Sequence, residues 1–107
     1  MSAPVLVACA AASLLLAVPV AAAAASLEGG RRAAGAADAA ALAAADAASG
    51  WIEADPCTLA REVAGAVGAT VGECEVDDAN GQVRISVTLQ TMLGTAQARA
   101  RAGPSLP

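Results

Sequence analysis

The first part of the chain is uncharged and apolar, and its pattern differs from everything that follows. No charged side chain occurs between Ser2 and Leu27. As an α-helix, Ala3–Leu27 would be about 37 Å long, which exceeds the roughly 30 Å hydrocarbon core of a bilayer. Pro19 lies inside this run, where proline is expected to kink a helix. We therefore predict a transmembrane anchor over residues 1–28.

Two other interpretations of this segment stay open. A cleaved secretory signal would find A-x-A cleavage sites within Ala21–Ala25, although no basic region precedes the apolar run. The run Leu6-Val7-Ala8-Cys9 fits a lipoprotein signal, but so short a leader has no room for a basic and a hydrophobic region. We therefore interpret Cys9 as a small apolar residue in lipid.

Residues 29–50 are rich in alanine and poor in bulky side chains, and we predict that they form a helical stalk. Small residues recur in this segment at every fourth position. Such a surface is either solvated or packs closely against neighbouring helices in an assembly. The candidate helix-packing residues are Ala33, Ala37, Ala41 and Ala45.

Residues 51–107 are predicted to form a small head that begins with a short helix. Asp55-Pro56 has the pattern of an N-cap followed by proline at the first helical position. Gly68 is a plausible C-terminal stop. The apolar stripe of this helix is expected at Leu59, Val63, Ala66 and Val67.

After Gly68 the apolar period changes to two, which predicts strands over residues 71–76 and 83–90 and a third over 96–102. Asn80-Gly81 is typical of a two-residue hairpin turn. That turn would pair Val76 with Ile85, Cys74 with Val87, Asp77 with Arg84 and Glu75 with Ser86. The expected fold class is α+β: a long N-terminal helix, then a short helix packed on a small antiparallel sheet of two or three strands.

Cys57 begins the predicted short helix and Cys74 lies on the core face of the first strand. A disulfide between them would close a loop of roughly 17 residues and stabilise the head by about 3 kcal/mol. Two buried thiols are the alternative. A disulfide favours a head outside the cytoplasm, whereas Arg31-Arg32 directly after the apolar run favours a cytoplasmic one. We give more weight to the cysteines, because the opposing signal consists of only two residues.

Composition narrows the classes of function further. The chain has no His and no Lys, and Trp51 is its one aromatic residue. Without His, the usual general base and the usual partner of a Ser or Cys nucleophile are missing, so we expect no enzyme, catalytic residue or small-molecule substrate. A net charge of −4 argues against nucleic acid. We expect no cofactor and no metal: two Cys are too few for zinc, and the acidic residues around Asp77 lack the spacing of an EF-hand.

Taken together, these features resemble the TadE/TadG-like family, pseudopilin-like proteins associated with tight-adherence pilus or secretion systems. The resemblance covers nearly the whole chain and is most specific over Arg31–Ala48, with support from the Cys57/Cys74 pair and Ala98–Pro104. The Gly and Glu of a prepilin cleavage site are not found. The resemblance implies a structural subunit, single-pass in the cell membrane, whose N-terminal helix packs against other pilin-like or secretion-system subunits. The alternative is a small secreted binding module released by signal cleavage.

Overall fold

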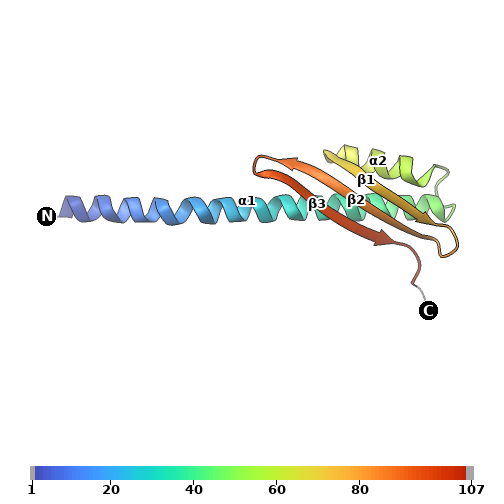
Figure 1. The fold of residues 1–107 in the computed structure, drawn as a ribbon, viewed down its shortest axis with the longest axis horizontal. Coiled ribbons are helices and arrows are strands. Elements are labelled where there is room, and N and C mark those ends of the chain that lie inside the picture. Colours follow the sequence, from blue (N-terminus) through green and yellow to red (C-terminus); the bar gives the residue numbers. More distant parts are fainter. Residues whose placement is uncertain (1, 106–107) are drawn as a thin grey trace.

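The computed structural model describes residues 2–105 and contains two helices and one three-stranded antiparallel sheet (Figure 1). The elements follow one another as α1 (Ser2–Ala48), α2 (Pro56–Ala66), β1 (Ala69–Asp77), β2 (Gln82–Thr91) and β3 (Gly94–Ala102). The expected α+β class is confirmed, including the third strand. The molecule is elongated, 75 × 29 × 18 Å, because the first half of α1 extends far beyond the head.

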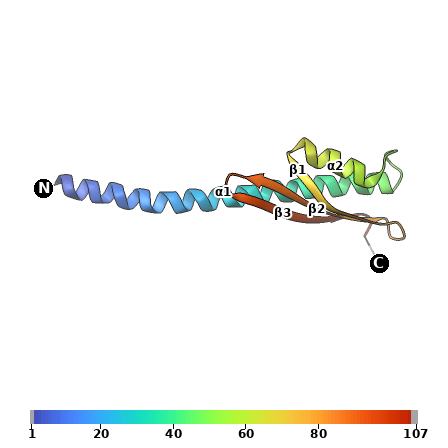
Figure 2. The ribbon, with the colours of Figure 1, turned by 45° about the horizontal axis from the view of Figure 1, so that its top comes forward.

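The first helix is continuous over 47 residues, through Pro19 and through the expected boundary at residue 28. Its two halves differ in their surroundings rather than in their backbone. No other described residue covers the N-terminal half, whereas the C-terminal half contacts α2, β2 and β3. Figures 1 and 2 both show α2 running alongside this second half while the sheet crosses it obliquely.

The head has its core between the C-terminal half of α1, one face of the sheet and α2. The largest fully buried side chains are Val83, Ile85 and Val87 of the central strand β2. Their helical counterparts are small. The residues that α1 buries are Gly29, Ala33, Ala36, Ala37, Ala40, Ala41, Ala44 and Ala45.

The predicted stalk is therefore not a separate domain but the central helix of the head. An alanine surface lets the sheet and α2 approach the backbone of α1 closely, so the segment is buried despite its lack of bulky side chains. The predicted domain 51–107 contains only part of the core, because α1 supplies the remainder. Head and stalk form one packed unit that begins at Gly29.

The short helix begins as predicted, but it buries a different face. Asp55 is the N-cap, with its carboxylate accepting a hydrogen bond from the Thr58 backbone N–H at 3.0 Å. The buried residues are Ala60 and Ala64. Of the expected stripe, Leu59 and Val63 are half-buried and Ala66 and Val67 are exposed. The alanine face is buried instead of the expected stripe because it fits closely against the alanine surface of α1.

The β1–β2 hairpin has the predicted faces but a register shifted by two residues. Val76 pairs with Val83, Cys74 with Ile85, Glu75 with Arg84, Asp77 with Gln82 and Glu73 with Ser86. A shift of two keeps every side chain on its own face of the sheet, so the alternating pattern alone does not separate the two registers.

The turn itself is a four-residue loop, 78–81, rather than the predicted two-residue turn. The Asp77 carboxylate accepts hydrogen bonds from the backbone N–H of Asn80 at 3.3 Å and from its Nδ2 at 2.8 Å. Gly81 has a φ of +67°, whereas no described non-glycine residue has a positive φ, so Asn80 does not adopt the type I′ conformation. The side chain of Asp77 thus replaces the tight turn with a wider one.

Candidate functional site

The N-terminal half of α1 is an apolar surface that the rest of residues 2–105 leaves uncovered. Every residue over 2–28 is exposed, including Leu14, Leu15 and Leu16, and Leu15 is 74% exposed. The helix is long and apolar enough to cross a membrane. Its polar Ser13 hydroxyl donates to the Cys9 carbonyl oxygen at 2.8 Å, so this group is satisfied within the helix.

This apolar surface ends where the head begins. Glu28 is the first charged residue after the run, and Arg31 and Arg32 follow one turn later, all three exposed. Between them lies Gly29, which is buried against Thr91 at the end of β2. A Cβ at Gly29 would lie 3.0 Å from Thr91 Cγ2. The head therefore starts directly at the charged end of the apolar surface, without a flexible linker.

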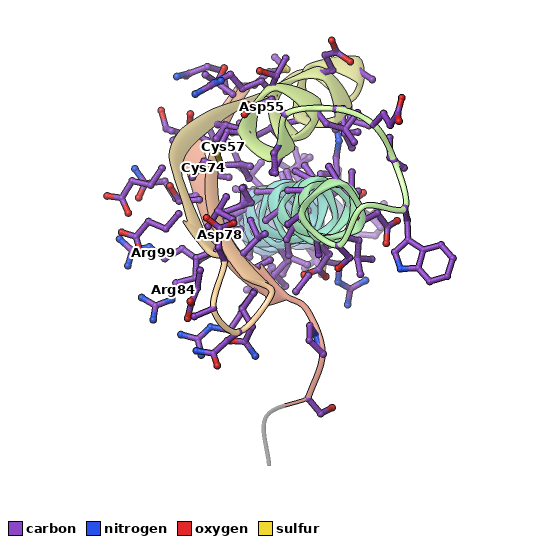
Figure 3. All side chains as sticks on the ribbon, turned by 90° about the vertical axis from the view of Figure 1, so that its right-hand side faces the viewer. Asp55, Cys57, Cys74, Asp78, Arg84 and Arg99 are labelled. Carbon is purple, nitrogen blue, oxygen red and sulfur yellow. A yellow bond between two sulfur atoms is a disulfide. The ribbon has the colours of Figure 1, made fainter. Side chains whose placement is uncertain are left out.

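The two cysteines of the head form the predicted disulfide. Cys57 in the first turn of α2 and Cys74 on β1 point toward one another (Figure 3), with a Cα–Cα distance of 5.9 Å. The bond joins α2 to the edge strand of the sheet. Cys9 is a free, exposed thiol on the apolar surface. The disulfide prediction is confirmed, and the alternative of two buried thiols is wrong.

The four candidate helix-packing alanines lie inside the chain's own core. Ala33 and Ala37 have no exposed surface, and Ala41 and Ala45 are also buried. They face α2 and the sheet of the same molecule. The expectation that they are solvated or contact neighbouring subunits is therefore wrong. These four alanines are therefore not available for contacts with another molecule, whereas the N-terminal half of α1 is exposed.

The outer face of the sheet is polar and carries Arg84, Arg99 and Arg101. Arg84 and Arg99 point away from α1 (Figure 3), and Arg84 forms an exposed ion pair with Glu75 at 3.8 Å. Such a pair contributes little to stability. Glu73, Glu75, Arg99 and Arg101 line a shallow hollow on this face. In the described part of the chain, no group of three or more His, Cys, Asp or Glu residues is arranged to hold a metal ion.

Two exposed carboxylates have pKa values that local hydrogen bonds lower. The backbone N–H and the hydroxyl of Thr58 donate to Asp55 and lower its pKa. The side chain and backbone of Asn80 do the same for Asp77. These groups cap a helix and shape a loop. Their ionisation is therefore tied to the local structure of the head.

Sequence reasoning did not single out the β2–β3 turn. Met92 and Leu93 are its central residues, both exposed, and Thr91 pairs with Gly94 across its base. The signal was present as an apolar pair between two alternating runs, directly before a glycine. Gly94 has a φ of +125°, which favours glycine at this position.

Comparison of the chain with models of protein families, with curated proteins and with solved structures finds no match. The interpretation of function below therefore comes from the sequence and the geometry. Two features carry it: the uncovered apolar helix and the disulfide-bonded head built directly onto that helix.

Proposed function

We propose that this chain is a membrane-anchored structural subunit of the pseudopilin-like, TadE/TadG type. In this proposal the N-terminal half of α1 spans the cell membrane, and the head lies on the extracytoplasmic side. The helix takes part in a pilus assembly or secretion system by packing against the helices of other subunits. The chain acts through these contacts and not through catalysis.

The observation that carries the proposal is the uncovered apolar half of α1. A monomeric soluble protein rarely exposes a continuous apolar surface of this size, because water solvates it poorly. Within a bilayer the same helix satisfies its own backbone hydrogen bonds and presents apolar side chains to lipid. The large apolar side chains of this surface are between 57% (Val5) and 74% (Leu15) exposed.

The disulfide supports the placement of the head outside the cytoplasm. Cys57 and Cys74 are bonded, and disulfides persist in oxidising compartments. Arg31 and Arg32 favour the opposite orientation by the positive-inside rule, but they are the two residues on which this signal depends. The core of the head consists of small aliphatic side chains, so the stabilisation from the disulfide is important for this head. We therefore give the disulfide more weight than the two arginines in placing the head.

The continuity of α1 supports a structural role. The same helix crosses the proposed membrane and forms the centre of the head, so a force or a rotation applied to the anchor is transmitted to the head. A flexible linker would uncouple them. Such coupling suits a subunit that has to hold its head in a fixed position within an assembly.

One observation favours the alternative of a secreted binding module. The core of the head begins at Gly29, and the candidate signal-cleavage sites lie upstream, within Ala21–Ala25. Cleavage there would remove the apolar surface and leave the core complete. The secreted form would then act through its exposed head surfaces.

Site-specific photocrosslinking in native membranes tests the proposed role. A photoreactive side chain at Leu15 should crosslink to other small single-span subunits, because this position is exposed on the membrane-spanning surface. The matched control is Leu42, which is 60% exposed on the same helix but within the head. Crosslinks to lipid alone from Leu15 would contradict the assembly role and leave the anchor standing.

A further inference from the structure

The two turns of the sheet have opposite chemical character. The β1–β2 loop contains Asp78 and Asn80, as expected for a solvated turn. The β2–β3 turn instead places Met92 and Leu93 at its tip. The Met92 side chain is fully exposed and Leu93 is 57% exposed. The tip of this turn is therefore an exposed apolar pair.

The apolar tip lies at the end of the head that faces the proposed membrane. The β2–β3 turn is the part of the sheet nearest the N-terminal half of α1 (Figure 1). Thr91, at its base, packs against Gly29. Gly29 is only two residues beyond Leu27, the last residue of the uncharged run, which corresponds to about 3 Å along a helix.

The tip is held in this position by local hydrogen bonds. The Thr91 hydroxyl donates to the Gly94 carbonyl oxygen at 2.7 Å and accepts from the Leu93 backbone N–H at 3.3 Å. The missing side chain at Gly29 lets Thr91 approach α1. Met92 and Leu93 are thus presented by a fixed turn beside the helix.

We propose that Met92 and Leu93 insert into the interfacial region of the same membrane that α1 crosses. The level at which they would insert is the level of Glu28, Arg31 and Arg32, three exposed charged side chains that would lie in the polar headgroup region and not in the hydrocarbon core. The inference rests on the proposed membrane anchor. It adds a second contact to that anchor, which fixes the rotation of α1 about its axis and the tilt of the head.

A bilayer is favoured over a protein partner because of this placement. Lipid at the end of the membrane span is necessarily beside the tip of every anchored molecule, whatever else is bound. Apolar side chains at such a depth enter the boundary between headgroups and acyl chains. The other loop, at the far end of β2, is polar and would face away from the membrane.

Tryptophan scanning in vesicles tests the insertion. The full chain carries Trp51→Phe, which removes its single tryptophan, and one new tryptophan at Met92, Ala79 or Val20. The variants are reconstituted into phosphatidylcholine–phosphatidylglycerol vesicles with or without lipids brominated on the upper part of the acyl chains. Leu93→Trp is a second variant of the same tip.

Met92→Trp and Leu93→Trp should show blue-shifted emission that the brominated lipids quench, as expected for shallow insertion. Val20→Trp, within the span, should also be quenched, and Ala79→Trp on the β1–β2 loop should not. Adding Leu93→Glu to Met92→Trp should reduce the quenching, because a carboxylate resists entry into the apolar region.

The outcomes separate this inference from the anchor. Quenching at Val20 without quenching at either tip position would overturn the insertion and leave the anchor intact, whereas no quenching at Val20 would overturn the anchor itself. A blue shift at Met92 that brominated lipids do not quench would show a protein partner or a second copy at the tip. Equal quenching at Ala79 would show a head lying flat on the membrane. Both results contradict the proposal.

Discussion

The alanine core can be tested by a single enlargement, Ala37→Leu. Ala37 has no exposed surface and lies at the centre of the buried row of α1. The added carbons fit only if α1 moves away from its neighbours, which weakens the close contacts of the whole row. Overpacking of this kind costs about 1–3 kcal/mol. If a cavity could take the new atoms, their burial would instead be favourable by about 0.8 kcal/mol per carbon.

The matched control is Ala34→Leu, which changes an exposed position of the same helix. Leucine and alanine differ little in helix propensity, so this variant should unfold like the wild type. The assay is native-state hydrogen exchange of the full chain in detergent micelles. The β2 amides report opening of the head, because β2 is the central strand.

The predicted result is faster exchange of the β2 amides in Ala37→Leu and unchanged exchange in Ala34→Leu. Wild-type exchange in Ala37→Leu, combined with loss of association between molecules, would refute the reasoning. It would mean that the alanine row contacts another subunit and that the head does not depend on it.

Three further outcomes are expected. Replacing both Cys57 and Cys74 by alanine should lower the free energy of unfolding of the head by about 3 kcal/mol, measured by the same exchange, since their loop spans 17 residues; unchanged exchange would contradict this. Gly81→Val should lower the melting temperature, because valine resists a φ of +67°, and an unaltered melting temperature would count against the loop geometry. The hydrogen bonds that lower the pKa of Asp55 and Asp77 stabilise the head at pH values above the ordinary carboxyl pKa of about 3.9, and this stabilisation is lost as the pH falls through the lowered pKa values. Asp55→Ser still caps the helix but does not titrate, so its melting temperature should fall less between pH 6 and pH 3 than that of the wild type. An identical fall in the two proteins would contradict this.

Local signals in the sequence predicted the elements of the head well. Asp55-Pro56 marks the start of α2, because the carboxylate and the proline ring suit a helix start whatever surrounds them. The pairing of Cys57 with Cys74 followed from placing one at a helix start and the other on a core-facing strand position. Such signals depend on a few neighbouring residues and survive in the folded chain.

The register and the core helix could not be predicted for different physical reasons. The register depends on the Asp77 side chain, whose carboxylate accepts hydrogen bonds from the backbone and side-chain amides of Asn80 in a wider turn. The role of residues 29–48 was hidden because buried and exposed positions are both alanine. Ala33 and Ala34 differ completely in burial, yet they carry no difference in polarity from which a face could be read.

The central claim is that the chain remains anchored by the apolar half of α1, and the mass of the mature protein tests it most directly. Membranes are washed with alkaline carbonate, and the intact mass is measured in the membrane and soluble fractions. We predict a membrane-retained chain that still contains residues 3–27. A soluble chain that begins after a cleavage within Ala21–Ala25 would contradict the anchored subunit and establish the secreted form.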